Sequence, residues 1–286
     1  MVARAEIRNA YRAACRAEID ALKPGNVHRF ADGHGMTAAQ FLESAELTAP
    51  PLTQPQWSVG RRVLDSVAVT RETIGTNTNL GILLLCAPLA MAAQAQTLDL
   101  QGDVSRVLEA MDENDARDVF RAIRVANPGG LGSTETHDVA RPPDVSLLEA
   151  MRAAADRDTV ARQYVTGFSE VFAGGLSALE QALGQGESGM WPTVSVYLHF
   201  LSSFPDSHVG RKYGPVAAED IRIEAELVRN QVLTLPDHRA RKDALMEFDA
   251  LLKQRGINPG TSADLTVATL FAATLNFVLQ NERANA

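Results

Sequence analysis

The segment FPDSHVGRKYG at residues 204–214 holds the densest group of reactive side chains in the chain. Asp206 and His208 are followed by Arg211 and Lys212 between two glycines. An arginine fork beside a lysine ammonium suits a polyphosphate, and a carboxylate such as Asp206 could hold a bridging Mg²⁺. The segment therefore predicts an anion site, with a surface turn carrying a basic pair as the alternative.

A second candidate is KPGNVHRF at residues 23–30, which places Lys23, His28 and Arg29 beside a predicted helix end. Gly25 lets the backbone approach a ligand closely, and Lys23 could bind a phosphate. The same residues also fit an ordinary helix C-terminus, where basic side chains complement the helix dipole and Pro-Gly ends the helix. Both interpretations stay open at this point.

The segment GTNTNLG precedes a long apolar run, with Gly75 and Gly81 on either side of TNTNL. Thr78 or Asn79 is a suitable N-cap, and the free amides of the following turn could bind an anion. Capping needs only one polar residue, whereas four stand in a row here. The surplus favours a binding role for this helix start.

Two acidic segments complete the set of candidates. GSTETHDVA brings Glu135, His137 and Asp138 within one turn, enough for a divalent cation or a general base, with a solvated loop as the alternative. In NPGTSADL, Thr261 and Asp264 have the spacing of a capping box. Because a first-turn carboxylate repels phosphate, a nucleotide contact by Asp264 would use Mg²⁺ or a ribose hydroxyl.

Several well-known site patterns are absent from the sequence. NPGGLGSTE lacks the last glycine of GxGxxG and follows a predicted helix instead of a strand, and GxxxxGK[ST], HExxH and GxSxG do not occur. Dinucleotide-binding folds, P-loop NTPases, zincin proteases and α/β-hydrolases are therefore excluded.

The elements that must position these segments are helices. Apolar residues recur with helical spacing almost throughout, as at Leu245, Phe248 and Leu252, and strand-like alternation is absent at useful length. The pattern predicts an all-α fold, a single compact bundle of roughly a dozen helices over residues 1–286 with the candidate sites in the loops. The expected helices are 3–21, 37–47, 56–73, 79–96, 103–111, 114–126, 144–157, 158–182, 193–202, 216–232, 237–255 and 263–280.

Composition limits the surroundings and partners of the protein. The chain has 286 residues, of which 45% are hydrophobic, and a net charge of −8, which argues against nucleic acid and anionic membranes as general partners. Cys15 and Cys86 are not spaced as in a paired motif such as CxxC, so we expect both to be reduced residues of the core. The N-terminus has no apolar block typical of a signal peptide, and the run from Leu80 to Ala93 is too short to span a bilayer. We expect a cytoplasmic protein.

Taken together, KPGNVHRF, GTNTNLG, GLGSTETHDV, DSHVGRKYG and NPGTSADL resemble, in order and spacing, the triphosphoribosyl-dephospho-CoA synthase family over nearly the whole chain. The resemblance implies an all-helical enzyme that moves the triphosphoribosyl group of ATP to the ribose 2′-hydroxyl of dephospho-CoA and expels adenine. ATP and dephospho-CoA, or another phosphorylated small molecule, are the partners it implies, with Mg²⁺ as cofactor.

On this resemblance, each candidate residue takes an expected role. The expected metal ligands are Asp206 and Asp264, and the expected catalytic residues are Glu135 or Asp138 as base together with His208. The expected nucleotide-binding residues are Lys23, His28, Asn77, Thr78, Asn79, Arg211, Lys212 and Ser262. All should face one interhelical cleft.

The resemblance also supports a second reading. The synthases typically carry NTHKG where this chain has Asn77 to Gly81, so Asn79 and Leu80 replace a histidine and a lysine. GTNTNLG and GLGSTETHDV look more like relatives in methanogens and methylotrophic bacteria, which accompany one-carbon pathways using tetrahydromethanopterin and methylofuran. A related transferase with another acceptor is thus one alternative.

Two further alternatives are not enzymes. One is a helical module that binds nucleotide without catalysis, and the other, less favoured by the polar loops, is a scaffold for protein partners. We expect a homodimer, because helical proteins of this size often pair through a helix face.

Overall fold

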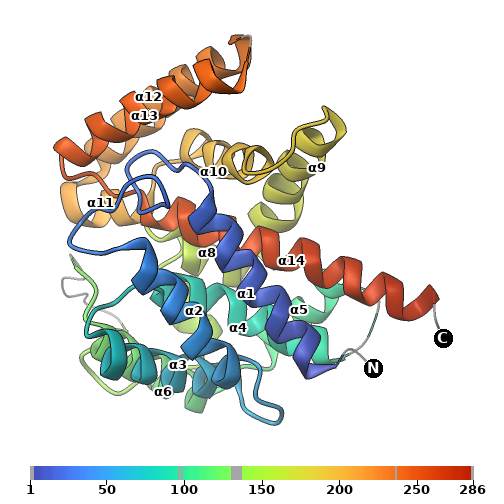
Figure 1. Ribbon diagram of the computed structural model, residues 1–286. Helices are drawn as coiled ribbons and strands as arrows, with labels where there is room; N and C mark the ends of the chain where they lie inside the picture. Colours follow the sequence, from blue (N-terminus) through green and yellow to red (C-terminus); the bar gives the residue numbers. More distant parts are fainter. Residues whose placement is uncertain (1–2, 96, 98, 130–136, 236, 285–286) are drawn as a thin grey trace.

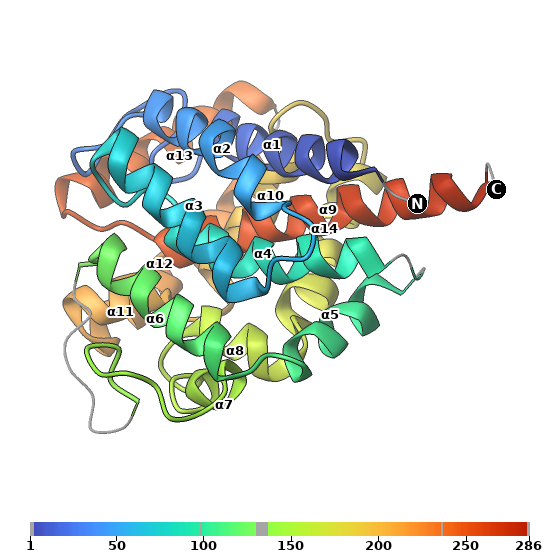
Figure 2. The same ribbon diagram turned by 90° about the horizontal axis from the view of Figure 1, so that it is seen from below.

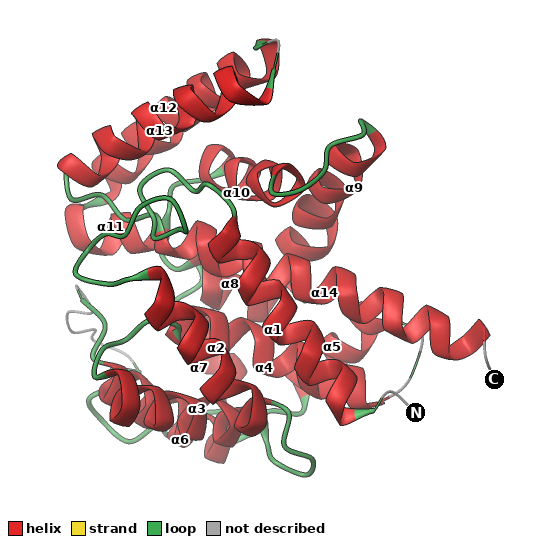
Figure 3. Cartoon of the chain, in the orientation of Figure 1, coloured by secondary structure: helices red, strands yellow, loops and turns green. Residues whose placement is uncertain are grey.

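The computed structural model describes residues 3–284 except 96, 98, 130–136 and 236. The described residues form helices and connecting loops, with no β-strand among them, as Figure 3 shows. This confirms the all-α prediction. The helices are α1 (Arg4–Asp20), α2 (Ala38–Leu52), α3 (Val59–Ile74), α4 (Leu80–Ala95), α5 (Leu100–Glu109), α6 (Glu113–Ala126), α7 (Leu147–Arg152), α8 (Thr159–Thr166), the π-helix η1 (Glu170–Gly175), α9 (Leu176–Gly184), α10 (Trp191–Ser203), α11 (Ser207–Tyr213), α12 (Pro215–Thr234), α13 (His238–Gln254) and α14 (Gly260–Ala284).

Helix α4 lies at the centre of the main core and packs against α14, α3 and α5. Its sequence LGILLLCAPLAMAAQA is apolar on every side, which is the pattern of a helix surrounded by other helices. Leu83, Leu85 and Leu89 are fully buried, as is Cys86. Cys15 and Cys86 are both free and buried, as the sequence predicted.

A hydrogen bond between α8 and α4 compensates for the proline inside α4. Pro88 has no N–H to donate to the carbonyl of Leu84 one turn earlier. The Tyr164 hydroxyl donates to that carbonyl instead, at 2.7 Å. Helix α8 is therefore held against the first half of α4.

Helix α14 runs along α1 and α4 as the other long core element (Figures 1 and 2). The stretch Gly260–Asn281 is long and apolar enough to cross a membrane by length and composition, but 67% of its most apolar window is buried within the molecule. Leu265, Phe271 and Leu275 are fully buried. Its apolarity thus serves packing inside the molecule.

A smaller apolar cluster joins α10, α12 and α13. Figure 1 shows α12 and α13 at the end of the molecule opposite α3 and α6. Leu201, Ile221 and Leu245 are fully buried in this cluster. Because α10 and α14 contribute to both clusters, they connect the two ends of the molecule. The prediction of a single domain over 1–286 stays a prediction.

The expected helices differ from the observed ones at two places that matter. The helix expected over 158–182 is broken after α8, where Gly167 and Phe168 both adopt φ of 61°, and it resumes as η1 and α9. The segment 204–214, expected as a loop, contains α11. Asp206 caps this short helix, so its basic residues project from a helix.

Candidate active site

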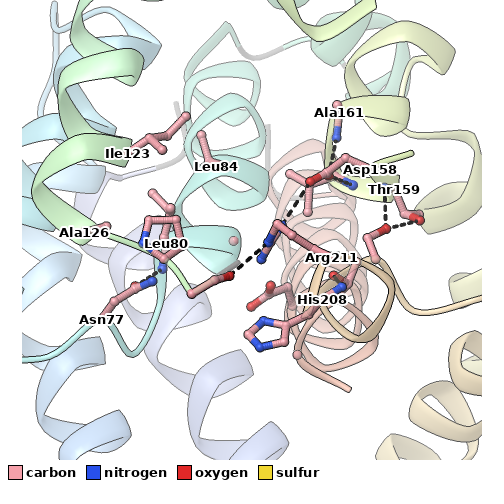
Figure 4. Close-up of a pocket in the computed structure, with 18 of the residues that line it drawn as sticks. Asn77, Leu80, Leu84, Ile123, Ala126, Asp158, Thr159, Ala161, His208 and Arg211 are labelled. Atoms are coloured by element: carbon pink, nitrogen blue, oxygen red, sulfur yellow. Dashed lines mark hydrogen bonds and ion pairs between the residues drawn. The ribbon is translucent and has the colours of Figure 1, made fainter. Parts of the chain in front are cut away.

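The N-terminal ends of α4, α8, α11 and α14 surround one cavity of about 910 Å³. The C-terminal end of α6 and the start of α12 complete the wall. Figure 4 shows Asn77 and Leu80 on one side of this cavity and Asp158, Arg211 and His208 on the other. Helix N-termini carry a partial positive charge that favours anionic groups, and the carboxylates of Asp158 and Asp206 already occupy the first amides of α8 and α11.

Asp206 ties α11 to α14. Its Oδ1 accepts from the amides of His208 and Val209 at 2.9 and 3.1 Å, which caps α11. Its Oδ2 accepts from the amide and the hydroxyl of Ser262 at 2.7 and 2.8 Å. Burial raises the pKa of Asp206, and these four hydrogen bonds act in the opposite direction.

The start of α8 is bonded to α11 in a similar way. Ser207 Oγ donates to Thr159 Oγ1 and accepts from the Thr159 amide, both at 2.8 Å. Asp158 caps α8 through Oδ1, while its Oδ2 lies 3.4 Å from Arg211 Nη1. Asp158 and Thr159 were not singled out in the sequence, although an aspartate before a predicted helix is a recognisable N-cap signal.

Arg211 and Lys212 lie at the cavity, as expected for phosphate ligands. Arg211 Nε also donates to the Gly129 carbonyl at 3.3 Å, so the guanidinium is already oriented. His208 lies beside them, and burial, helped by the positive charges of Arg211 and Lys212, lowers its pKa to about 4. The His208 imidazole is therefore neutral at pH 7.

The charges around the cavity nearly balance. The described lining residues include five basic side chains and six carboxylates. The basic ones are Arg71, Arg157, Arg162, Arg211 and Lys212, and the acidic ones are Glu18, Asp138, Asp156, Asp158, Asp206 and Asp264. Because these charges nearly cancel, a strongly anionic ligand needs a local group of cations, such as the adjacent side chains of Arg211 and Lys212.

One side of the cavity is apolar. Leu80, Leu84, Ile123 and Ala126 come from α4 and α6 and face the cavity together (Figure 4). Leu80 is 8% exposed, so this position gives the wall hydrocarbon where a lysine would give charge. The cavity thus has an apolar side and a charged side, which suits a ligand with both kinds of surface.

Of the loop at 23–30, only Asn26 lines the cavity. Lys23 is fully buried, and its Nζ donates to Glu18, Asn26 and the Val27 carbonyl. His28 is also fully buried, with Nε2 3.3 Å from the Asp249 carboxylate. The prediction that Lys23 and His28 bind nucleotide directly is not supported, because protein groups surround both side chains.

Ser262 is likewise fully buried and bonded to Asp206. It lies behind the cavity, so the structure gives it a part in holding α11 and α14 together instead of the direct nucleotide contact predicted from the sequence.

The GTNTNLG corner does line the cavity. Helix α4 begins at Leu80, so Asn79 occupies the predicted N-cap position, and its carbonyl accepts from the Leu83 amide at 2.9 Å. The side chain that caps the helix is that of Asn77, whose Oδ1 accepts from the Leu80 amide at 3.1 Å. Thr78 Oγ1 hydrogen-bonds Ser44 Oγ at 2.6 Å. Asn79 is 5% exposed, and neither atom of its amide has a hydrogen-bond partner in the described part of the chain.

The acidic loop is described only in part. Glu135 lies outside the described residues. His137 and Asp138 are half-buried and line the cavity, and Asp138 Oδ1 accepts from the Ala140 amide at 2.8 Å. Asp138 is thus near the other candidates, as predicted.

The expected capping box at α14 does not form. The helix begins at Gly260, and Thr261 Oγ1 accepts from the His208 amide at 3.2 Å instead of capping α14. Asp264 therefore turns to the cavity, where its carboxylate touches Gly81. Burial above all, with the nearby Asp206 and Glu18 carboxylates, raises the pKa of Asp264 well above its usual range.

The described residues form a helical fold in which basic side chains line a large cavity, an arrangement suited to binding an anionic small molecule. Comparison with known proteins specifies the family. The family model of ATP:dephospho-CoA triphosphoribosyl transferases matches residues 4–282. The chain belongs to this family and is a transferase.

A solved structure agrees with this assignment. A candidate triphosphoribosyl-dephospho-CoA synthase from Archaeoglobus fulgidus is similar to the chain at 30% sequence identity, with a TM-score of 0.64. The similarity covers 82% of this chain and 98% of the archaeal one. A search among curated proteins gave no match.

Proposed function

We propose that the protein transfers the triphosphoribosyl group of ATP to the 2′-hydroxyl of dephospho-CoA and releases adenine. Family membership supports this reaction, and it favours an enzyme over the non-catalytic nucleotide-binding module. The observation that carries the proposal is the single cavity at which Arg211, Lys212 and several helix N-termini meet an apolar wall. ATP has matching parts, a polyanion and a flat base.

The charged side would hold the triphosphate. The Arg211 guanidinium is fixed by Asp158 and Gly129 and can present its remaining N–H groups to phosphate oxygens. Lys212 is exposed and adds a mobile point charge. Fixing the phosphates here positions the ribose of ATP deeper in the cavity.

The reaction requires carbon one of the ribose to develop positive character as adenine leaves. The apolar wall of Leu80, Leu84 and Ile123 can pack against a base without offering it charge. A neutral His208 offers one N–H for hydrogen bonding to a nearby acceptor atom. Glu135 and Asp138 remain the predicted candidates for the base that takes the hydroxyl proton.

The expected Mg²⁺ site on Asp206 and Asp264 does not fit the residues found there. Both oxygens of Asp206 are taken by four protein hydrogen bonds. Among the described residues, no group of three or more His, Cys, Asp or Glu side chains is arranged to hold a metal ion. We therefore assign no step to a protein-held metal, and propose that Mg²⁺ arrives on the phosphates of ATP.

An assay for free adenine tests the proposed reaction. The protein is incubated with ATP, Mg²⁺ and dephospho-CoA, and free adenine is measured by chromatography together with the mass of the modified dephospho-CoA. Adenine release that depends on dephospho-CoA is the expected result. ATP binding without adenine release for this acceptor would reject the proposed reaction.

A second candidate differs only in the acceptor. Leu80 and Asn79 leave the α4 side of the cavity without the charges of NTHKG, which favours an acceptor with less negative charge on that side. The candidate is the related transferase of one-carbon cofactor biosynthesis, and replacing dephospho-CoA with tetrahydromethanopterin or methylofuran precursors in the same assay tests it.

The cytoplasmic location, the homodimer and the lack of nucleic-acid or membrane partners stay predictions.

A further inference from the structure

Two polar side chains at the junction of α4 and α14 have no partner within the described residues. Asn79 is 5% exposed, and both its amide nitrogen and its amide oxygen lack hydrogen bonds. Asp264 lines the same cavity, and no hydrogen bond or ion pair involves its carboxylate. Leaving the buried Asn79 amide unpaired is unfavourable, and the Asp264 side chain is half-buried at the cavity, so both side chains are suited to hydrogen-bond a ligand.

Gly81 holds these two side chains in one place. Gly81 lies two residues after Asn79, and a Cβ atom at this position would overlap the Asp264 carboxylate. Only glycine therefore lets the carboxylate lie against the first turn of α4. The close approach places Asp264 beside the segment that carries Asn79.

The charges nearby identify the kind of group that fits. Besides burial, which is the main cause, the nearby Asp206 and Glu18 carboxylates raise the pKa of Asp264, and Arg211 acts in the opposite direction. A phosphate would meet repulsion at this position, whereas a hydroxyl can donate to a carboxylate and both donate to and accept from an amide. The chemical class that matches is a neutral sugar edge with vicinal hydroxyls.

We propose that Asn79 and Asp264 bind the ribose of the acceptor and that Asp264 is the base that removes the proton from its attacking hydroxyl. This inference rests on the proposed transfer to a hydroxyl. The O–H bond of the acceptor breaks and its proton goes to the Asp264 carboxylate. The oxygen forms the new bond to carbon one of the ATP ribose as the bond to adenine breaks with its electron pair. Adenine takes a proton from water, and Asp264 returns its proton to water.

The proposal is tested with Asp264→Asn, which keeps the size of the side chain and removes the base. Adenine release should fall by at least about a hundredfold, while the dissociation constants for MgATP and for the acceptor, measured by calorimetry, change less than about tenfold. The matched control is Asp220→Asn, because Asp220 is an exposed carboxylate on α12 that does not line the cavity, and its turnover should equal that of the wild type.

A second pair of variants covers the case in which Asp264→Asn does not fold. Gly81→Ala keeps the carboxylate but displaces it, so turnover should also fall by at least about tenfold. Gly184→Ala, at the end of α9 away from the cavity, where a Cβ meets no atom within 4 Å, should leave turnover unchanged. Asn79→Ala should raise the KM for the acceptor more than that for ATP.

Three outcomes would overturn the proposal. The first is normal turnover in Asp264→Asn or in Gly81→Ala. The second is loss of Mg²⁺-dependent ATP binding in Asp264→Asn, which would make the carboxylate a metal ligand. The third is a loss of activity in Asp138→Asn that equals the loss in Asp264→Asn at unchanged acceptor affinity. Failure of the proposed function itself looks different, because the wild type would then release no adenine.

Discussion

Two segments that look alike in the sequence have opposite surroundings in the structure. KPGNVHRF and DSHVGRKYG both combine glycine, histidine and basic residues, and both suggested phosphate binding. Lys23 is fully buried with three protein partners, whereas Arg211 and Lys212 lie at the cavity. The comparison teaches that residue type alone does not identify a side chain that binds phosphate. The side chain must also have N–H groups that no protein acceptor already uses.

The largest effect should come from Lys23→Met. The substitution leaves Glu18 buried without its cation, which typically destabilises a protein by about 3–5 kcal/mol. Thermal unfolding should occur at a much lower temperature, whereas the remaining folded protein should bind ATP normally. Lys242→Met is the control, because Lys242 on α13 lies over the Phe30 ring of the same loop, a contact typically worth about 0.5–1 kcal/mol near the surface.

The double variant Lys23→Met with Glu18→Gln sharpens this test. Removing the second charge should recover part of the lost stability, because no unpaired carboxylate remains. A stable Lys23→Met protein with weakened ATP binding would instead make Lys23 a phosphate ligand and remove the contrast between the two segments.

The next effect concerns His208, the histidine of the second segment. Its unfolded pKa is near 6.5 and its folded pKa is about 4, so the folded state resists protonation. The corresponding stability is fully present above pH 6.5 and is lost as the pH falls toward 4, by up to roughly 3 kcal/mol. Urea unfolding of wild type and His208→Gln between pH 4 and pH 7 should show a steeper loss for the wild type; equal slopes would contradict the burial of a neutral imidazole.

Arg211→Ala should have a smaller effect of a different kind. The side chain is partly exposed, so stability should change little, but the loss of a charged hydrogen bond to phosphate typically amounts to about 1.5–3 kcal/mol. The dissociation constant for ATP should rise about 10- to 100-fold in calorimetry. Arg222→Ala is the control, because Arg222 pairs with Glu219 and Glu226 on α12 and does not line the cavity.

How far the sequence predicted the site depends on the range of the interaction involved. Helical periodicity is local, so the helices and the buried α4 followed from spacing alone. Asp206 at the start of α11 was recognisable as polar and acidic, but its bonds to Ser262 join residues 56 positions apart. The same holds for Thr261, which accepts from His208 instead of forming a capping box. Long-range partners of this kind leave no local pattern in one sequence.

The smallest effect should come from Asn79→His with Leu80→Lys, which gives α4 the residues of NTHKG. Leu80 lines the cavity at 8% exposure, so a lysine there can extend toward the solvent end of the cavity, and one added cation near a triphosphate should tighten ATP binding by about tenfold or less. Calorimetry with ATP and with inorganic tripolyphosphate measures the change, and Leu80→Met controls for altered packing. Equal tightening for both ligands would place the new charge near the phosphates and extend the charged side of the cavity to α4. If neither ligand binds more tightly, the α4 side does not contact phosphate, and the contrast between the neutral α4 side and the basic α11 side holds in the bound enzyme as well.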